Sequence, residues 1–165
     1  MARKETTAFL AELVERKINP YNDTRIYYAK EVTFDYSGSA KRVDFVQFRP
    51  VNNTIGGIEH GDFYCYEIKS SVEDFRSKNG HNLLGDYNYY VMPREVFEKV
   101  KDEIPWGIGV MCPEDGIPPR LVPVKNAGRK TRSRATSEIL LMMLRSVNRE
   151  YIKFRKENTK NGDDE

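Results

Sequence analysis

Apolar residues recur at helical spacing near both ends of this chain. The first such segment spans Glu5–Lys17, and the second runs from Ser133 to about Lys156 with charged residues on the opposite face. Both patterns predict amphipathic helices, because positions three and four residues apart share one side of a helix. The two apolar stripes consist of Phe9, Leu10, Leu13 and Val14, and of Leu140, Leu144, Val147, Tyr151 and Phe154.

Between these helices lie short runs rich in Tyr, Ile, Val, Thr and Phe, each bounded by turn residues. Such runs predict β-strands. They cover Arg25–Phe34, Arg42–Phe48, Asp62–Lys69, Tyr87–Met92 and Trp106–Cys112, and Arg120–Val124 is compatible with a short sixth strand. Turns are expected at Tyr36–Ser39 and Pro113–Pro119, and the second and third strands should form a hairpin with a long tip.

Two further helices are expected between the strands. The segment Ser70–Asp74 contains two overlapping capping boxes, so one helix should begin directly after Lys69. Pro93 opens the other, over Arg94–Asp102. The alternation of helices and strands predicts an α/β fold. We expect a single domain over residues 1–157 and a flexible tail over residues 158–165.

The composition is typical of a globular protein of the cytoplasm. Of the 165 residues, 39% are hydrophobic and 32% are charged, and no apolar run is long enough for a transmembrane helix. The N-terminal residues lack the apolar segment of a secretory signal peptide. Cys65 and Cys112 lie in apolar runs, which favours buried free thiols in a reducing compartment. We therefore expect a cytoplasmic protein without a membrane partner.

The net charge of +2 conceals one strongly basic segment. From Lys125 to Arg134 the chain carries five cations and no acidic residue, so the rest of the chain sums to −3 (+2 − 5). A segment of this kind suits a polyanion such as nucleic acid, although a solvated basic loop has the same composition. Its cations are Lys125, Arg129, Lys130, Arg132 and Arg134.

Charged residues interrupt two of the predicted strands. Asp44 lies in the middle of one, and Glu67 and Lys69 share one face at the end of the next. If these strands pair as a hairpin, the two carboxylates meet, and their repulsion calls for a cation between them. Oxygen ligands of this type suit Mg²⁺ or Mn²⁺, which would activate a water for phosphodiester cleavage. Lys69 would orient that water or neutralise charge in the transition state.

These residues resemble the core of a known nuclease superfamily. Arg42–Val46 and Tyr66–Arg76, with the run E-I-K-S-S-V-E-D-F, are similar to the PD-(D/E)XK nucleases and, among them, to the MmcB-type DNA-repair proteins. The similarity continues through Gly85–Pro93 and Gly107–Val110. It covers roughly Lys30–Cys112, about half of the chain. The E-I-K-S-S-V-E-D-F run is its most specific part.

The resemblance implies a restriction-endonuclease-like fold, in which helices flank a mixed central sheet, and a metal-dependent deoxyribonuclease. It implies that Asp44 and Glu67 bind the metal, together with a strand carbonyl that we assign to Ile68, and that Lys69 is the catalytic lysine. The superfamily often adds a glutamate from the first helix. The candidates are Glu5, Glu12 and Glu15, of which Glu12 on the central turn is preferred, and Glu31 in the first predicted strand is the alternative.

The chain departs from the family pattern in the segment Lys78–Leu84, which is shorter and lacks a tryptophan found there in the family. Candidate contacts to phosphate are Lys78, His81, Arg129, Lys130, Arg132 and Arg134. For His81, a role as a satisfied surface or core residue is the alternative. We expect a Mg²⁺- or Mn²⁺-dependent nuclease that acts on DNA or RNA and that would act alone or as a homodimer. A catalytically silent module that binds nucleic acid or protein on the same fold is the rival hypothesis.

Overall fold

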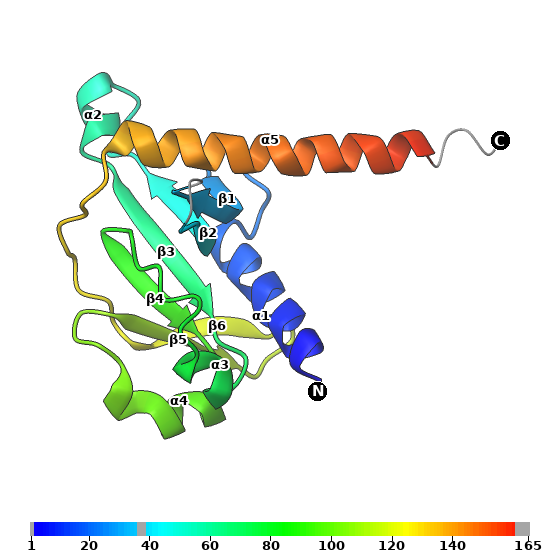
Figure 1. The fold of residues 1–165 in the computed structure, drawn as a ribbon, viewed down its shortest axis with the longest axis vertical. Helices are drawn as coiled ribbons and strands as arrows, with labels where there is room; N and C mark the ends of the chain where they lie inside the picture. Colours follow the sequence, from blue (N-terminus) through cyan, green and yellow to red (C-terminus); the bar gives the residue numbers. More distant parts are fainter. Residues whose placement is uncertain (1, 36–38, 161–165) are drawn as a thin grey trace.

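The computed structural model describes residues 2–35 and 39–160, which form a six-stranded sheet flanked by helices (Figure 1). The elements are α1 (Arg3–Ile18), β1 (Tyr27–Phe34), β2 (Lys41–Arg49), α2 (Ile55–Glu59), β3 (Asp62–Ile68), α3 (Val72–Arg76), β4 (Tyr87–Val91), α4 (Arg94–Val100), the 3-10 helix η1 (Lys101–Glu103), β5 (Gly109–Glu114), β6 (Arg120–Lys125) and α5 (Thr136–Lys160).

The strands lie in the sheet in chain order. β1, β2 and β3 form an antiparallel meander, β3, β4 and β5 run parallel, and β6 returns antiparallel beside β5. Parallel neighbours need a crossover connection, and these contain α3 and then α4 with η1. The prediction of an α/β fold with a mixed sheet flanked by helices is therefore confirmed.

One face of the sheet is covered by α1. The apolar stripe of this helix packs on β2, β3 and β4 and on the strands beyond them, as its helical spacing predicted. This core consists of Leu10, Leu13, Val14 and Ile18 from α1 and of Phe45, Tyr66, Ile68, Val91, Met111 and Leu121 from the sheet.

The opposite face is covered in two separate places. α5 packs Ile139 and Met143 against β1, β2 and β3. α3 and α4 pack Phe75, Val96 and Val100 against β4 and β5. Since side chains alternate along a strand, every second residue of β3 points toward this face, between the two helical covers.

Several predicted elements have different boundaries in the structure. The strand expected from Trp106 begins at Gly109, and Trp106 is 96% exposed. This strand continues to Glu114, so the turn expected at Pro113–Pro119 is shorter. The hairpin tip between β2 and β3 contains α2, whose first turn is capped by the Thr54 side chain. Cys65 and Cys112 are buried free thiols, as expected.

The last helix extends further than predicted. α5 has 25 residues and continues to Lys160, so residues 158–160 of the expected tail are helical. Residues 161–165 of that tail, and Tyr36–Gly38 of the turn expected after β1, lie outside the described residues. Figure 1 shows the C-terminal half of α5 projecting beyond the sheet. None of the described helices is long and apolar enough to cross a membrane.

Candidate active site

The backbone pairing of β2 with β3 ends beside Asp44. The last paired residues are Phe45 and Tyr66, so the next position of the same register places Asp44 opposite Glu67. At this position the Asp44 side chain, and not a backbone carbonyl of β2, accepts the hydrogen bond of the Ile68 N–H, at 2.8 Å from Asp44 Oδ2. The predicted hairpin is confirmed, and it brings the two acidic residues together.

Glu67 is a buried carboxylate with an unsatisfied oxygen. It is 1% exposed, and its Oε1 has no hydrogen-bond partner among the described residues. Burial, and then the negative charge of Asp44, raise the pKa of Glu67 to about 8, although Lys69 opposes the shift. Asp44 is affected in the same direction, because burial raises its pKa while the Ile68 N–H lowers it. Buried acceptors without partners are costly, so this arrangement favours an added cation.

Lys69 is buried beside these carboxylates. Its Nζ donates a hydrogen bond of 2.6 Å to the Asn79 carbonyl. Burial lowers the pKa of Lys69, while the negative charges of Asp74, Glu67 and Asp44 oppose the shift in that order. The ammonium group is therefore held in place by the loop after α3 and is surrounded by acidic groups.

The loop after α3 lies directly over the site. Gly80 has a φ of +66°, and a Cβ there would lie 2.9 Å from Lys69 Nζ and 3.2 Å from Glu67 Oε2. The Asn82 side chain donates to the Arg42 carbonyl at 2.8 Å, which ties the loop to β2. This is the segment that departs from the family pattern, and its glycine allows the backbone itself to cover the two charged groups.

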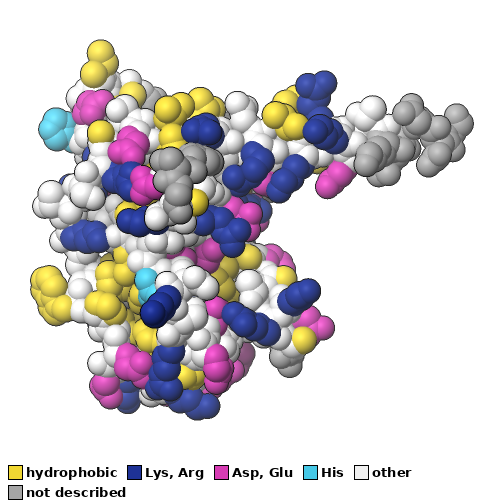
Figure 2. Space-filling model, in the orientation of Figure 1, with side chains coloured by type: hydrophobic (Ala, Val, Ile, Leu, Met, Phe, Trp, Pro, Cys, Tyr) yellow, Lys and Arg dark blue, Asp and Glu magenta, His cyan; other side chains and the backbone are white. Residues whose placement is uncertain are grey.

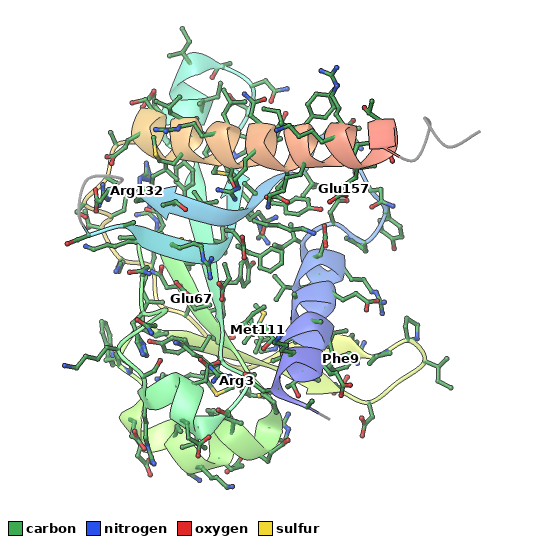
Figure 3. The ribbon with its side chains drawn as sticks, turned by 45° about the vertical axis from the view of Figure 1, so that its right-hand side comes forward. Arg3, Phe9, Glu67, Met111, Arg132 and Glu157 are labelled. Carbon is green, nitrogen blue, oxygen red and sulfur yellow. The ribbon has the colours of Figure 1, made fainter. Side chains whose placement is uncertain are left out.

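Asp74 is a site residue that we did not assign from the sequence. Its Oδ2 accepts hydrogen bonds from the backbone and hydroxyl of Ser70, and its Oδ1 forms a 2.9 Å ion pair with Arg3 of α1. The sequence signal was present in the capping box, where Ser71 accepts from the Asp74 N–H. Figure 3 shows Arg3, at the start of α1, below Glu67.

Two adjoining cavities form one groove across this site. They share Arg42, Asp44, Ile68 and Asp74, and their volumes are about 570 Å³ and 400 Å³. The first continues under the loop to Lys78. The second runs between α1 and β1 as far as Glu150 of α5. The groove is open at both ends, so it suits an extended ligand better than a small enclosed one.

The structure separates the candidate glutamates. Glu12 lies outside the groove, where its carboxylate pairs with Arg16 at 2.5 Å on the exposed side of α1. The groove-facing positions of α1 are Arg3, Thr7 and Ala11. Glu31 does line the groove, and it pairs with Arg42 at 3.7 Å. The structure thus brings Glu31, and not Glu12, to the groove, and the choice of ligand between them stays a prediction. Glu5 bonds to the Ala2 N–H, and Glu15 bonds to Tyr28 and Lys30.

The donor set at the site is small. Among residues 2–35 and 39–160, no three His, Cys, Asp or Glu side chains cluster as a metal site would require by side chains alone. Asp44 and Glu67 nevertheless fit a divalent ion, because Glu67 Oε1 is buried and unbonded and the two carboxylates repel each other. The remaining ligands would be the Ile68 carbonyl and water, as hard cations accept.

His81 and the basic segment have mainly internal partners. The ring nitrogens of His81 contact Tyr90 Oη at 2.7 Å and the Ser77 carbonyl at 2.9 Å, and His81 does not line the groove. Arg132 pairs with buried Asp86 at 2.9 Å, and Arg134 pairs with Asp35 at 2.6 Å. Figure 3 shows Arg132 in the connection before α5.

These contacts give Arg132 and Arg134 a structural role, and the phosphate contacts that the sequence suggested for them stay a prediction. Arg129 pairs with Asp62 at 3.0 Å, and Lys130 donates to the Leu83 carbonyl. Both side chains lie at the exposed surface. A contact from them to nucleic acid stays a prediction.

Comparison with known proteins identifies a structure with a similar fold but indicates no activity. No protein-family model matches this chain, and no curated protein matches it. Among solved structures it is similar to the SPO1766 protein of unknown function from Silicibacter pomeroyi, with a TM-score of 0.59 and 15% identity. The match covers 93% of this chain and 91% of that one. At this identity the match shows the fold alone, which extends over nearly the whole of both chains.

Replacing Glu67 by Gln should stabilise the metal-free protein at alkaline pH. The pKa of Glu67 is raised from 4.5 to about 8, so wild-type stability falls as the pH rises through this window, by at most about 1.4 kcal/mol for each pKa unit. The advantage in Tm of Glu67→Gln over wild type should therefore grow between about pH 5 and about pH 9. Thermal unfolding in EDTA measures it, with the exposed Glu98→Gln as control. An equal difference at both pH values contradicts the prediction.

Substituting Gly80 by Ala should disturb the site without removing any charged group. The added Cβ would lie 2.9 Å from Lys69 Nζ, and the positive φ strains an alanine. We expect a loss of about 1–3 kcal/mol in the free energy of unfolding. Gly56→Ala is the matched control, because a Cβ there meets nothing within 4 Å. Chemical denaturation that finds the two variants equally stable would rule out close coverage by the loop.

Proposed function

We propose that this protein is a metal-dependent nuclease that cleaves DNA, as its resemblance to PD-(D/E)XK enzymes implies. The observation that carries the proposal is buried Glu67, with an unbonded oxygen, between Asp44 and Lys69 on an open groove. Burying two carboxylates that repel each other and a desolvated lysine in one place costs folding free energy, so a purely structural role does not explain them. Clusters of groups with perturbed pKa values in a groove are typical of active sites.

The acidic pair supports a divalent cation. Asp44 and Glu67 supply two anionic oxygen ligands, and the Ile68 carbonyl is the neighbouring strand acceptor. Such hard ligands suit Mg²⁺ or Mn²⁺. The bound ion would polarise the phosphodiester and lower the pKa of a water. Glu31, which lies along the groove, would reach this region by releasing Arg42.

The remaining residues position the substrate and the attacking water. Lys69, fixed by the Asn79 carbonyl, presents its ammonium beside the acidic pair, where it would stabilise negative charge that develops on the phosphate. Its lowered pKa brings it closer to a neutral amine that orients the water. Asp74 holds Arg3 at the mouth of the groove, so Arg3 and Arg42 flank the position of a phosphate.

The groove suits a polyanionic chain. Arg3, Lys30 and Arg42 line its α1 side, and exposed Lys78 lies at its other end. Cations of this kind contact phosphates without reading sequence, which predicts salt-sensitive and weakly selective binding. We place the substrate along this groove, inside a cytoplasmic enzyme, and assign the basic segment before α5 a secondary role.

Cleavage assays test the enzyme proposal directly. Wild-type protein with Mn²⁺ should cut plasmid or single-stranded DNA, and Asp44→Ala and Lys69→Ala should each lower the rate on the order of a hundredfold or more. Glu12→Gln is the matched control and should retain the wild-type rate, because Glu12 lies outside the groove. Circular dichroism verifies that each variant is folded.

Two outcomes would contradict this proposal. If wild type cuts nothing that the Asp44 and Lys69 variants spare, the protein is not a nuclease. If calorimetry then finds Mn²⁺ binding that Glu67→Ala abolishes, the fold carries a silent metal-binding module. DNA binding without either property would leave a simple nucleic-acid-binding domain.

Salt dependence tests the path of the substrate. Lys78→Ala should weaken DNA binding in EDTA for all sequences and reduce the slope of log K against log salt by about 1. Arg120→Ala provides the control, because Arg120 pairs with Glu114 on β5 away from the groove. Fluorescence anisotropy over a salt series measures both slopes. Equal slopes for Lys78→Ala and wild type would move the binding surface elsewhere.

A further inference from the structure

The projecting half of α5 exposes large apolar side chains. Of the twelve exposed large hydrophobic residues among the described residues, six belong to this helix. They include Tyr151 and Phe154, which are 57% and 61% exposed. Figure 2 shows hydrophobic side chains grouped with Lys and Arg on the part of α5 that projects from the body. Contiguous exposed apolar surface of this kind marks a binding surface.

Four of these exposed residues, preceded by half-buried Leu140, form a heptad stripe, which we call the α5 seam, whereas exposed Leu141 and Ile152 lie off it. Its members are Leu140, Leu144, Val147, Tyr151 and Phe154, spaced 4, 3, 4 and 3 residues apart. This spacing is that of a two-stranded coiled coil, with Leu144 and Tyr151 at a positions and the others at d positions. The seam lies beside the face that packs on the sheet, where Ile139 and Met143 are buried, and its first member, Leu140, packs partly against that core. Ser146 donates to the Lys30 carbonyl on that buried face.

Charges beside the seam specify a second copy of this chain as the occupant. Glu150 and Glu157 occupy g positions on one flank, and Arg155 occupies an e position on the other. Within its own helix Glu150 pairs with Arg149 at 3.2 Å and with Lys153 at 3.0 Å. In a parallel pair, a g residue faces the e residue five positions further along the second helix, so Glu150 meets Arg155 of the second copy. In the antiparallel alignment that pairs Val147 with Tyr151, Glu150 would face Glu150 of the second copy. The charges complement each other only in the parallel pair.

An apolar groove beside α5 continues the seam onto the body of the protein. It has a volume of about 420 Å³, and Leu140, Met143, Leu144 and Val147 form its helix side. The opposite side consists of Ile26, Tyr27, Tyr28, Phe48, Pro50, Asn53 and Ile58. A helix that packs along the seam would cover this groove as well, so the contact would bury more apolar surface than a two-heptad coiled coil alone.

We infer that α5 is the dimerisation element of this protein, pairing in parallel with α5 of a second copy through the α5 seam. The two bodies then lie on opposite sides of the helix pair, because each is attached to the face of its own helix beside the seam. The contact leaves Arg149 and Lys153 free of the seam. The seam spans about two heptads and is therefore short, so the dimer should be reversible and depend on concentration.

Sedimentation and charge reversal test this arrangement. Wild-type protein should shift from monomer to dimer between micromolar and submillimolar concentration, and Tyr151→Glu should remain monomeric. Glu150→Arg should weaken the dimer by at least about tenfold, since it opposes Arg155 of the second copy. The double variant Glu150→Arg with Arg155→Glu should restore it. A wild type that stays monomeric throughout, or a double variant no tighter than the single one, overturns the inference.

Cysteine crosslinking tests the parallel register. Val147→Cys should form a disulfide-linked dimer under mild oxidation, because equivalent d residues face each other in a parallel pair. Lys156→Cys is the matched control, exposed on the other side of the same helix. Native Cys65 and Cys112 are buried and give little background. A dimer by sedimentation in which Val147→Cys does not crosslink refutes the parallel pairing. The nuclease proposal is independent of these results.

Discussion

The structure depends on keeping an acidic pair and a lysine buried at one end of β3. Glu67 is 1% exposed with an unbonded oxygen, which is unfavourable by itself. Three neighbours make it tolerable: the Ile68 N–H holds the Asp44 carboxylate, Lys69 supplies positive charge, and the Asn79 carbonyl holds Lys69. These contacts involve β2, the end of β3 and the loop after α3, so the site requires the folded sheet and the loop together.

The layers of the fold explain why the groove opens here. α1 covers one face, whereas α5 and the α3–α4 pair cover the other face at opposite ends. The end of β3 emerges between these two covers, and only a loop with a glycine at its centre lies above it. The Arg3–Asp74 pair then joins the start of α1 to α3, which fixes the mouth of the groove.

Local patterns predicted most of the fold and the acidic core of the site. Strand alternation and the capping serines depend on neighbouring residues only, so Asp44, Glu67 and Lys69 could be placed from the sequence. The partners of Arg132 and Arg134 lie 46 and 99 residues away, and composition cannot reveal such pairs. The position of Glu12 outside the groove could not be predicted for a related reason. An apolar stripe shows which side of α1 is buried, but the neighbouring polar position that faces the groove depends on how the helix is set on the sheet.

The apolar stripe on α5 is a second feature whose surroundings could not be predicted from the sequence. Helical spacing indicated an apolar face but could not show whether a sheet lies beneath it. The helix is about 37 Å long, and β1 supports only its first half. Packing on the sheet explains the burial of Ile139, Met143 and Ser146. Tyr151 and Phe154 lie outside this core and are exposed. Large apolar side chains on a projecting helix are stabilising only when something covers them, and the flanking charges match the helix itself. A protein that cuts one strand at each active site would gain a second site from this pairing.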